Sequence, residues 1–156
     1  MNVLLKKGDI FEDEHILDFV CITTNSILNK NGELVMGAGI AKRAKDLHKE
    51  LPKLFGDAIK SKNAISGFYG MLLAKDKYVA FQTKVHWKDK SPINVVKRSI
   101  SMLERTAVKY KDKKFGLPFP AINNGGLTVD VVLPYLENLP DNVIVYHLED
   151  ILKEIL

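Results

Sequence analysis

Two glycine-rich stretches in this sequence could hold a phosphate group through the protein backbone. The first glycine loop consists of Gly37, Ala38, Gly39 and Ile40, and the second glycine loop consists of Asn124, Gly125, Gly126 and Leu127. Each comes just before a segment whose apolar residues have helical spacing. Glycine lets the backbone approach a ligand closely, and the unpaired N–H groups of a first helical turn attract an anion. The two loops therefore predict a site for a phosphate-bearing ligand.

The first glycine loop alone is a weak signal. It lacks the third glycine of the dinucleotide-binding fingerprint, and about a dozen residues separate it from the preceding predicted strand. No Gly-Lys-Ser/Thr sequence follows it, so it is not a Walker A motif. A helix that begins with small residues explains it equally well. The second loop strengthens the interpretation because loops at the carboxyl ends of parallel strands gather at one edge of a sheet.

Three other residues also follow predicted strands and should lie at the same edge. Asp9 could accept hydrogen bonds from an amino group such as that of adenine, or it could be an ordinary turn residue. Lys84 could neutralise a phosphate or, with a lowered pKa, attack the C1 atom of a sugar, although most lysines are solvated surface charges. Trp87, next to His86, could stack on a base or sugar, or could pack beneath a loop.

Predicted strands alternate with predicted helices along the chain. The predicted strands are residues 2–6, 18–24, 67–73, 78–83, 115–122 and 142–147. The predicted helices begin at residues 12, 39, 52, 91, 129 and 149, and Ser91 and Pro92 occupy the cap and first-turn positions of the longest. This alternation predicts an α/β fold with a largely parallel sheet that is covered by helices on both faces.

Apolar spacing predicts which side of each helix is buried. Ile16 and Leu17 form the expected buried side of the helix that begins at residue 12. Ala44, Leu47 and Leu51 share one face of the next helix.

The composition predicts one globular domain over residues 1–156, because the chain is 46% hydrophobic and 27% charged and contains no low-complexity tract. The single Cys21 excludes an internal disulfide and, inside an apolar run, is expected to be a buried small side chain rather than a nucleophile. We find no signal-peptide pattern and no apolar run long enough to span a bilayer, so we expect a cytoplasmic protein without membrane contact.

The four histidines show no metal-ligand spacing. They are His15, His48, His86 and His147, and no cysteine accompanies any of them. We therefore expect neither a metal nor another cofactor.

Positive charge is concentrated in one part of the chain. The net charge is +4, but residues 75–114 alone contain 12 Lys and Arg against 4 Asp and Glu. Such a basic block attracts anionic partners and predicts a possible contact with DNA or RNA. A solvated helix face with basic loops explains the same charges without any partner.

Together these motifs resemble those of macro domains, which are ADP-ribose-binding modules with a three-layer α/β/α sandwich around a mixed, mostly parallel sheet. The resemblance covers nearly the whole chain. The motifs are Gly8-Asp9-Ile10, Thr24-Asn25, Met36-Gly37-Ala38-Gly39-Ile40-Ala41, Thr83-Lys84 and Pro-Ala-Ile-Asn-Asn-Gly-Gly-Leu at residues 120–127. They are most similar to the branch of DNA and glutamate ADP-ribosyl glycohydrolases, which includes antitoxins. The Lys-x-His-Trp run at residues 84–87 also occurs in phage and bacterial relatives of that branch.

The resemblance implies a role for each matching residue. Asp9 would hold the adenine amino group with help from the Ile10 backbone, and Asn25 would contact the distal ribose. The two glycine loops would cradle the diphosphate. Lys84 would act at the anomeric carbon of the distal ribose.

The chain departs from the family pattern at Thr128. Relatives with glycohydrolase activity have Asp after Gly-Leu, and Thr cannot serve as a carboxylate. Asp130, two residues further on, could replace it as a third catalytic candidate beside Lys84 and Thr128, or could simply favour the start of a helix through its charge.

Three functions follow as alternatives. The first is a hydrolase that removes ADP-ribose from modified DNA or protein, or phosphate from ADP-ribose-1''-phosphate. The second is a non-catalytic reader or sponge for ADP-ribose or a related nucleotide, and the third is a nucleic-acid-binding domain that uses the basic block. In the first two, the partner is ADP-ribose or an ADP-ribosylated macromolecule, and the chain is expected to be a monomer.

Overall fold

A mixed six-stranded sheet forms the centre of the computed structural model, which describes residues 3–62, 67–149 and 151. Its strands are β1 (Leu4–Lys7), β2 (Phe19–Thr24), β3 (Met71–Ala74), β4 (Tyr78–Gln82), β5 (Phe115–Pro118) and β6 (Val143–His147). They lie in the order β1-β6-β5-β2-β4-β3. All neighbours are parallel except β3, which is antiparallel to β4. The predicted mostly parallel sheet is therefore confirmed.

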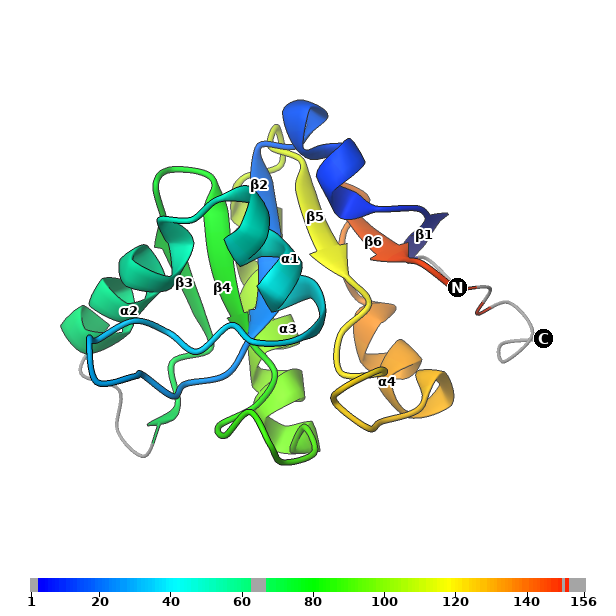
Figure 1. The fold of residues 1–156 in the computed structure, drawn as a ribbon. Coiled ribbons are helices and arrows are strands. Elements are labelled where there is room, and N and C mark those ends of the chain that lie inside the picture. Colours follow the sequence, from blue (N-terminus) through cyan, green and yellow to red (C-terminus); the bar gives the residue numbers. More distant parts are fainter. Residues whose placement is uncertain (1–2, 63–66, 150, 152–156) are drawn as a thin grey trace.

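Helices cover both faces of the sheet (Figure 1). They are α1 (Gly39–Leu47), α2 (Leu51–Lys62), α3 (Ile93–Lys109) and α4 (Val129–Leu136). One hydrophobic cluster joins the sheet to α1 and α2, and a second joins the opposite face to α3 and α4. The predicted three-layer α/β/α arrangement is confirmed. No helix in the described part of the chain is long and apolar enough to cross a membrane.

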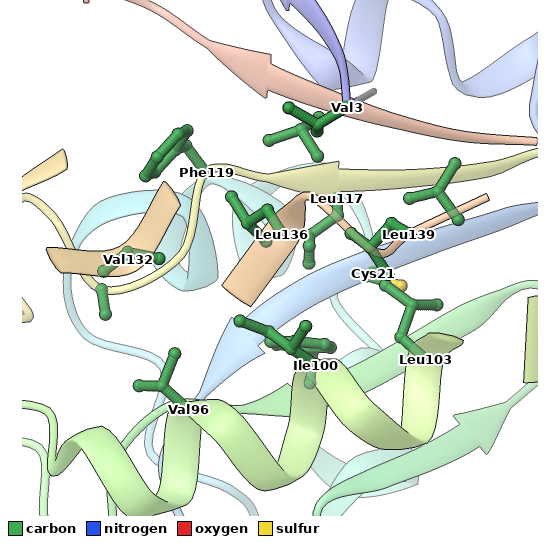
Figure 2. Close-up of a cluster of buried hydrophobic side chains, with 14 of the residues drawn as sticks. Val3, Cys21, Val96, Ile100, Leu103, Leu117, Phe119, Val132, Leu136 and Leu139 are labelled. Atoms are coloured by element: carbon green, nitrogen blue, oxygen red, sulfur yellow. The ribbon is translucent and has the colours of Figure 1, made fainter. Parts of the chain in front are cut away.

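The inner strands β6, β5, β2 and β4 are largely buried on both faces, as expected for parallel strands beneath helices, whereas the edge strands β1 and β3 are partly exposed. On β2, the side chain of Cys21 is fully buried, and burial raises the pKa of its thiol to about 12. Figure 2 shows this side chain in the same cluster as Val96, Ile100 and Leu103 of α3. These three residues recur at helical spacing on one face. Cys21 is thus a small core residue, as predicted.

The predicted helix from residue 12 to residue 17 is wrong. The chain instead forms two 3-10 turns, η1 (Ile10–Glu12) and η2 (Glu14–Ile16). The Asp9 carboxylate accepts a hydrogen bond from the Phe11 N–H, so the first turn begins before residue 12. Leu17 is buried as expected, but Ile16 is 48% exposed because a single turn has no continuous buried face.

The predicted inward face of α1 is also partly wrong, since Leu47 is 49% exposed. The helix ends at Leu47, and His48 closes it through a hydrogen bond from its N–H to the Ala44 carbonyl. Leu51 is fully buried but belongs to α2, so the pattern Ala44–Leu47–Leu51 combines two helices.

Several predicted boundaries shift. The strand expected over residues 115–122 ends at Pro118, because the two prolines at 118 and 120 cannot donate to a neighbouring strand. The strand expected over residues 67–73 begins only at Met71. Pro92, rather than Ser91, is the N-cap of α3. Most of the helix predicted to begin at residue 149 lies outside the described residues.

Candidate functional site

A cavity of about 660 Å³ lies at the edge of the sheet where the parallel strands end. Segments that follow β1, β2, β4, β5 and β6 all contribute to its lining. In Figure 1 the chain leaves β2, β4 and β5 on the lower side of the sheet. This is the edge at which the sequence predicts a ligand site.

Most residues predicted to bind a ligand line this cavity. They are Asp9, Ile10, Asn25, Gly37, Ala38, Gly39, Ile40, Asn124 and Gly125, and Lys84 lines it with them. Two predicted binding residues are outside the lining. They are Gly126, which is exposed beside the Lys90 side chain, and Leu127, which packs against the hydrophobic core.

The two other catalytic candidates are also outside the cavity lining. Thr128 is the N-cap of α4, although its side chain makes no capping hydrogen bond. Asp130 is exposed in the first turn of the same helix, a position where a negative charge favours the helix dipole. The structure therefore does not bring either side chain into the cavity with Lys84.

The two glycine loops touch beside the cavity. Gly39 has a φ of +57°, and a Cβ atom at this position would lie 2.8 Å from Asn124 Nδ2. The backbone conformation and the contact with Asn124 both favour glycine here. The loops thus approach each other from opposite sides of the sheet, since α1 follows the first and α4 the second.

The backbone of these loops presents unpaired donors. Within the described part of the chain, the N–H groups of Gly39, Ile40, Asn124 and Gly125 donate to no acceptor. All four residues line the cavity. The second loop contains a tight turn in which the Gly126 N–H donates to the Asn123 carbonyl at 3.1 Å, and the Leu127 N–H closes the loop by donating to the Ala121 carbonyl at 2.9 Å. Unpaired N–H groups from two loops form a suitable cradle for phosphate oxygens.

Lys84 connects the end of β4 to the second glycine loop. Its Nζ donates to the Asn124 carbonyl at 2.7 Å and to the Trp87 carbonyl at 3.1 Å. Burial lowers the pKa of the Lys84 amine below its usual value of 10.5, and the nearby charge of Asp89 opposes this effect. A larger fraction of neutral, nucleophilic amine results.

Trp87 belongs to the cavity lining and lies near Lys84. The residue is 51% exposed, which argues against the alternative in which Trp87 packs beneath a loop. An exposed indole ring in a cavity lining could stack on a flat ligand group.

Asn25 has a structural role in addition to lining the cavity. Its Nδ2 donates to the Val35 carbonyl, and its Oδ1 accepts from the Ile27 N–H, each at 2.9 Å. The buried amide thereby holds together the two ends of the segment that leads from β2 to the first glycine loop.

The sequence patterns did not identify some cavity-lining residues. They include Phe119 after β5, the last two residues of β6 (Tyr146 and His147), and Leu148, Glu149 and Ile151 after β6. The rule that loops gather at strand carboxyl ends, applied to the last predicted strand, would have found those around β6. Arg43 was also missed, although its place four residues after Gly39 puts both on one helix face.

Among the described residues, no cluster of three or more His, Cys, Asp or Glu side chains is arranged to hold a metal ion.

Comparison of the sequence with protein-family models and with curated proteins gives no match. Comparison of the fold with solved structures gives clear similarities. DarTG of Thermosipho africanus, solved in complex with ADP-ribose, is 25% identical with a TM-score of 0.71. The similarity covers 92% of this chain but 41% of that protein, so this chain spans less than half of it.

Two isolated domains are similar over nearly their whole length. The macrodomain of Thermus aquaticus DarG is 22% identical, with a TM-score of 0.72 and coverage of 94% of this chain and 97% of that one. The macrodomain of Mycobacterium tuberculosis DarG is also 22% identical, with a TM-score of 0.70 and coverage of 93% and 96%. The chain therefore has the macrodomain fold, in the form found in DarG proteins.

Proposed function

We propose that the cavity binds ADP-ribose and that the chain removes ADP-ribose from a modified DNA or protein acceptor. The observation that carries this proposal is the position of Lys84, an amine of lowered pKa, in the same cavity as the two glycine loops. The ADP-ribose in the structure of the similar Thermosipho africanus DarTG supports the choice of ligand.

The order of the strands suggests how the ligand lies. Asp9 follows β1 and Lys84 follows β4, with β6, β5 and β2 between those strands. We place the adenine at Asp9 and Ile10, the diphosphate on the unpaired N–H groups of the two glycine loops, and the distal ribose at Lys84. In this orientation Asn25, which follows the central strand β2, lies beside the ribose.

The proposed reaction begins with the neutral Lys84 amine. Its lone pair attacks C1 of the distal ribose, and the bond from C1 to the acceptor breaks. The acceptor leaves with the bonding electrons and takes up a proton that the Lys84 nitrogen loses. Water then hydrolyses the bond between Lys84 and the sugar, which releases ADP-ribose and restores the amine.

A non-catalytic reader is the second candidate, and the lining of the cavity favours it. A carboxylate that assists release would have to come from the lining, where the described carboxylates are Asp9 and Glu149. Asp9 follows β1 and Glu149 follows β6, so both lie away from the end of β4, which Lys84 follows. If the chain is a reader, it binds ADP-ribose without turnover. In that case the Thr128→Asp variant gains hydrolysis only if the N-terminus of α4 can approach the ligand.

The basic block supports a nucleic-acid acceptor. Among the described residues, no Lys or Arg between residues 84 and 114 takes part in an ion pair. Of these charges, those that follow β4, such as Lys88 and Lys90, are available to phosphates of an acceptor strand that reaches the cavity, whereas Lys114 lies at the opposite edge of the sheet. We propose that a DNA acceptor contacts this block, in which case its binding weakens with salt more steeply than that of free ADP-ribose.

A release assay with a matched binding assay tests the proposal. Wild type, Lys84→Ala and Lys30→Ala are incubated with ADP-ribosylated DNA and with ADP-ribosylated glutamate, and calorimetry gives their affinities for ADP-ribose. Lys30 is exposed and lies outside both the cavity lining and the basic block, so its substitution controls for the loss of one positive charge. We expect Lys84→Ala to abolish release, with ADP-ribose affinity kept within about fivefold, and Lys30→Ala to behave as wild type.

The possible results separate the two functions. Binding without release from either substrate by wild type supports the reader and rejects the hydrolase. Release that survives in Lys84→Ala rejects the proposed nucleophile. Failure of wild type to bind ADP-ribose rejects both functions.

A further inference from the structure

Asp9 shares its part of the cavity with an arginine. Arg43 Nη2 lies 2.5 Å from Asp9 Oδ2, and the other carboxylate oxygen, Oδ1, accepts the Phe11 N–H at 2.9 Å. The Asp9 side chain is only 12% exposed. Each oxygen therefore has one partner from the protein and still has a lone pair for a ligand. The hydrogen bond from Phe11 and the ion pair with Arg43 together restrain the carboxylate.

Arg43 is itself held in place. Its guanidinium carbon lies 5.5 Å from the centre of the Phe11 ring, within the range of a cation–π contact. Phe11 is buried, so it offers a rigid surface. The arginine reaches from α1 across to η1 and lines the cavity, whereas its neighbour Lys42 does not.

We propose that Arg43 is a positioning residue that fixes the Asp9 carboxylate as an acceptor for an amino group, and thereby makes the site selective for adenine over a 6-oxopurine. The inference rests on the proposed function. A carboxylate only accepts hydrogen bonds, and adenine carries an amino donor at C6. Hypoxanthine carries an oxygen there, so two acceptors would face each other without a proton between them.

A simpler role for Arg43 would be general attraction of the ligand's phosphates. Lys42 provides the matched comparison, because it carries the same charge on the same helix. It pairs with Asp46 on the surface, as Arg43 pairs with Asp9. General attraction changes the affinity for every diphosphate ligand equally, whereas fixing Asp9 changes the preference between bases.

The experiment compares two ligands that differ only at the base. Wild type, Arg43→Gln and Lys42→Gln are titrated by calorimetry with ADP-ribose and with inosine diphosphate ribose. We expect wild type to prefer ADP-ribose, and Arg43→Gln to reduce the ratio of the two affinities about tenfold. Lys42→Gln should leave the ratio unchanged. The ratio is informative because a partly unfolded sample lowers both apparent affinities equally.

A double-mutant cycle tests whether Arg43 acts through Asp9. We expect Asp9→Asn to remove the preference, because an amide can donate to the oxo group as well as accept from the amino group. Adding Arg43→Gln to Asp9→Asn should then change the ratio by less than about twofold.

The outcomes distinguish the inference from the function on which it rests. The inference is overturned if wild type prefers ADP-ribose and Arg43→Gln keeps that preference within about twofold. It is also overturned if Arg43→Gln still changes the ratio in the Asp9→Asn background. If wild type binds neither ligand, the proposed function itself is rejected.

Discussion

At the scale of single residues, two opposing influences act on the pKa of the Lys84 amine. Two carbonyl oxygens accept hydrogen bonds from Nζ, which favours the charged form, while burial disfavours it. The net result is a lowered pKa. The carbonyls also hold the amine in one position at the cavity wall. In the proposed reaction, the lowered pKa shifts Lys84 toward the neutral form that can attack a sugar carbon.

The pH dependence of release should follow the pKa of Lys84. Only the neutral amine can attack, so the rate should rise with pH and level off at a pH below 10.5. The negative charge of Asp89 raises this pKa, and Asp89→Asn should therefore shift the rise to lower pH. Release rates measured from pH 6 to 10 test this shift, with exposed Asp112→Asn as the control. A shift to higher pH, or an equal shift in the control, would contradict the role of Asp89.

Two buried serines should respond in opposite ways to the loss of their hydroxyl groups. Ser91 Oγ is buried and has no hydrogen-bond partner within the described residues. Ser91→Ala should therefore raise the free energy of unfolding by about 0.5–1 kcal/mol. Ser99 Oγ donates to the Gln82 carbonyl at 2.6 Å, so Ser99→Ala should lower the free energy of unfolding by about 1–2 kcal/mol. Urea unfolding measures both free-energy changes. If the two substitutions destabilise the protein equally, Ser91 has a hydrogen-bond partner in solution.

At the scale of elements, the start of α1 depends on glycine at only one of two nearby positions. Gly39 has a positive φ and touches Asn124, whereas a Cβ atom at Gly37 would meet no protein atom within 4 Å. Gly39→Ala should lower the free energy of unfolding by about 1–2 kcal/mol relative to Gly37→Ala. Both substitutions restrict the unfolded chain equally, so the difference isolates strain in the folded state. Thermal or urea unfolding measures it, and equal stabilities would mean that Gly39 is not strained.

The sequence predicts these elements well where a pattern is long or hydrophobic on all sides. The apolar run of β2 and the spacing of Val96, Ile100 and Leu103 were sufficient to predict a buried strand and a sheet-facing helix. The pattern fails over residues 12–17, because one hydrogen bond from the Phe11 N–H to Asp9 decides how the turns begin. It fails again at Leu47, because the apolar residues that appear to share one helix face belong to two short helices.

The candidate site was predicted less completely than the fold. Gly37, Gly39 and Lys84 could be found because glycine and strand-end signals are local in the sequence. Arg43 could not be paired with Asp9, since their contact joins two elements that only the folded chain brings together. Likewise, the exclusion of Asp130 from the cavity lining depends on the path of the chain between Gly125 and α4.

At the scale of the whole molecule, one sheet edge gathers segments from five strands into a single cavity. A ligand with a base at one end and a sugar at the other can contact Asp9 and Lys84 together only if it crosses the ends of the intervening strands. The glycine loops meet beside this path, where a diphosphate would lie. The fold thus explains why residues separated by most of the sequence could act on one ligand.

A structure of the chain with bound ADP-ribose tests the proposed reaction most directly. The measurement is the distance from Lys84 Nζ to C1 of the distal ribose. We predict a separation of about 3–3.5 Å, the range of a near-attack geometry, with the adenine amino group at the Asp9 carboxylate. A reversed ligand, or a C1 atom more than about 6 Å from Nζ, would contradict attack by Lys84.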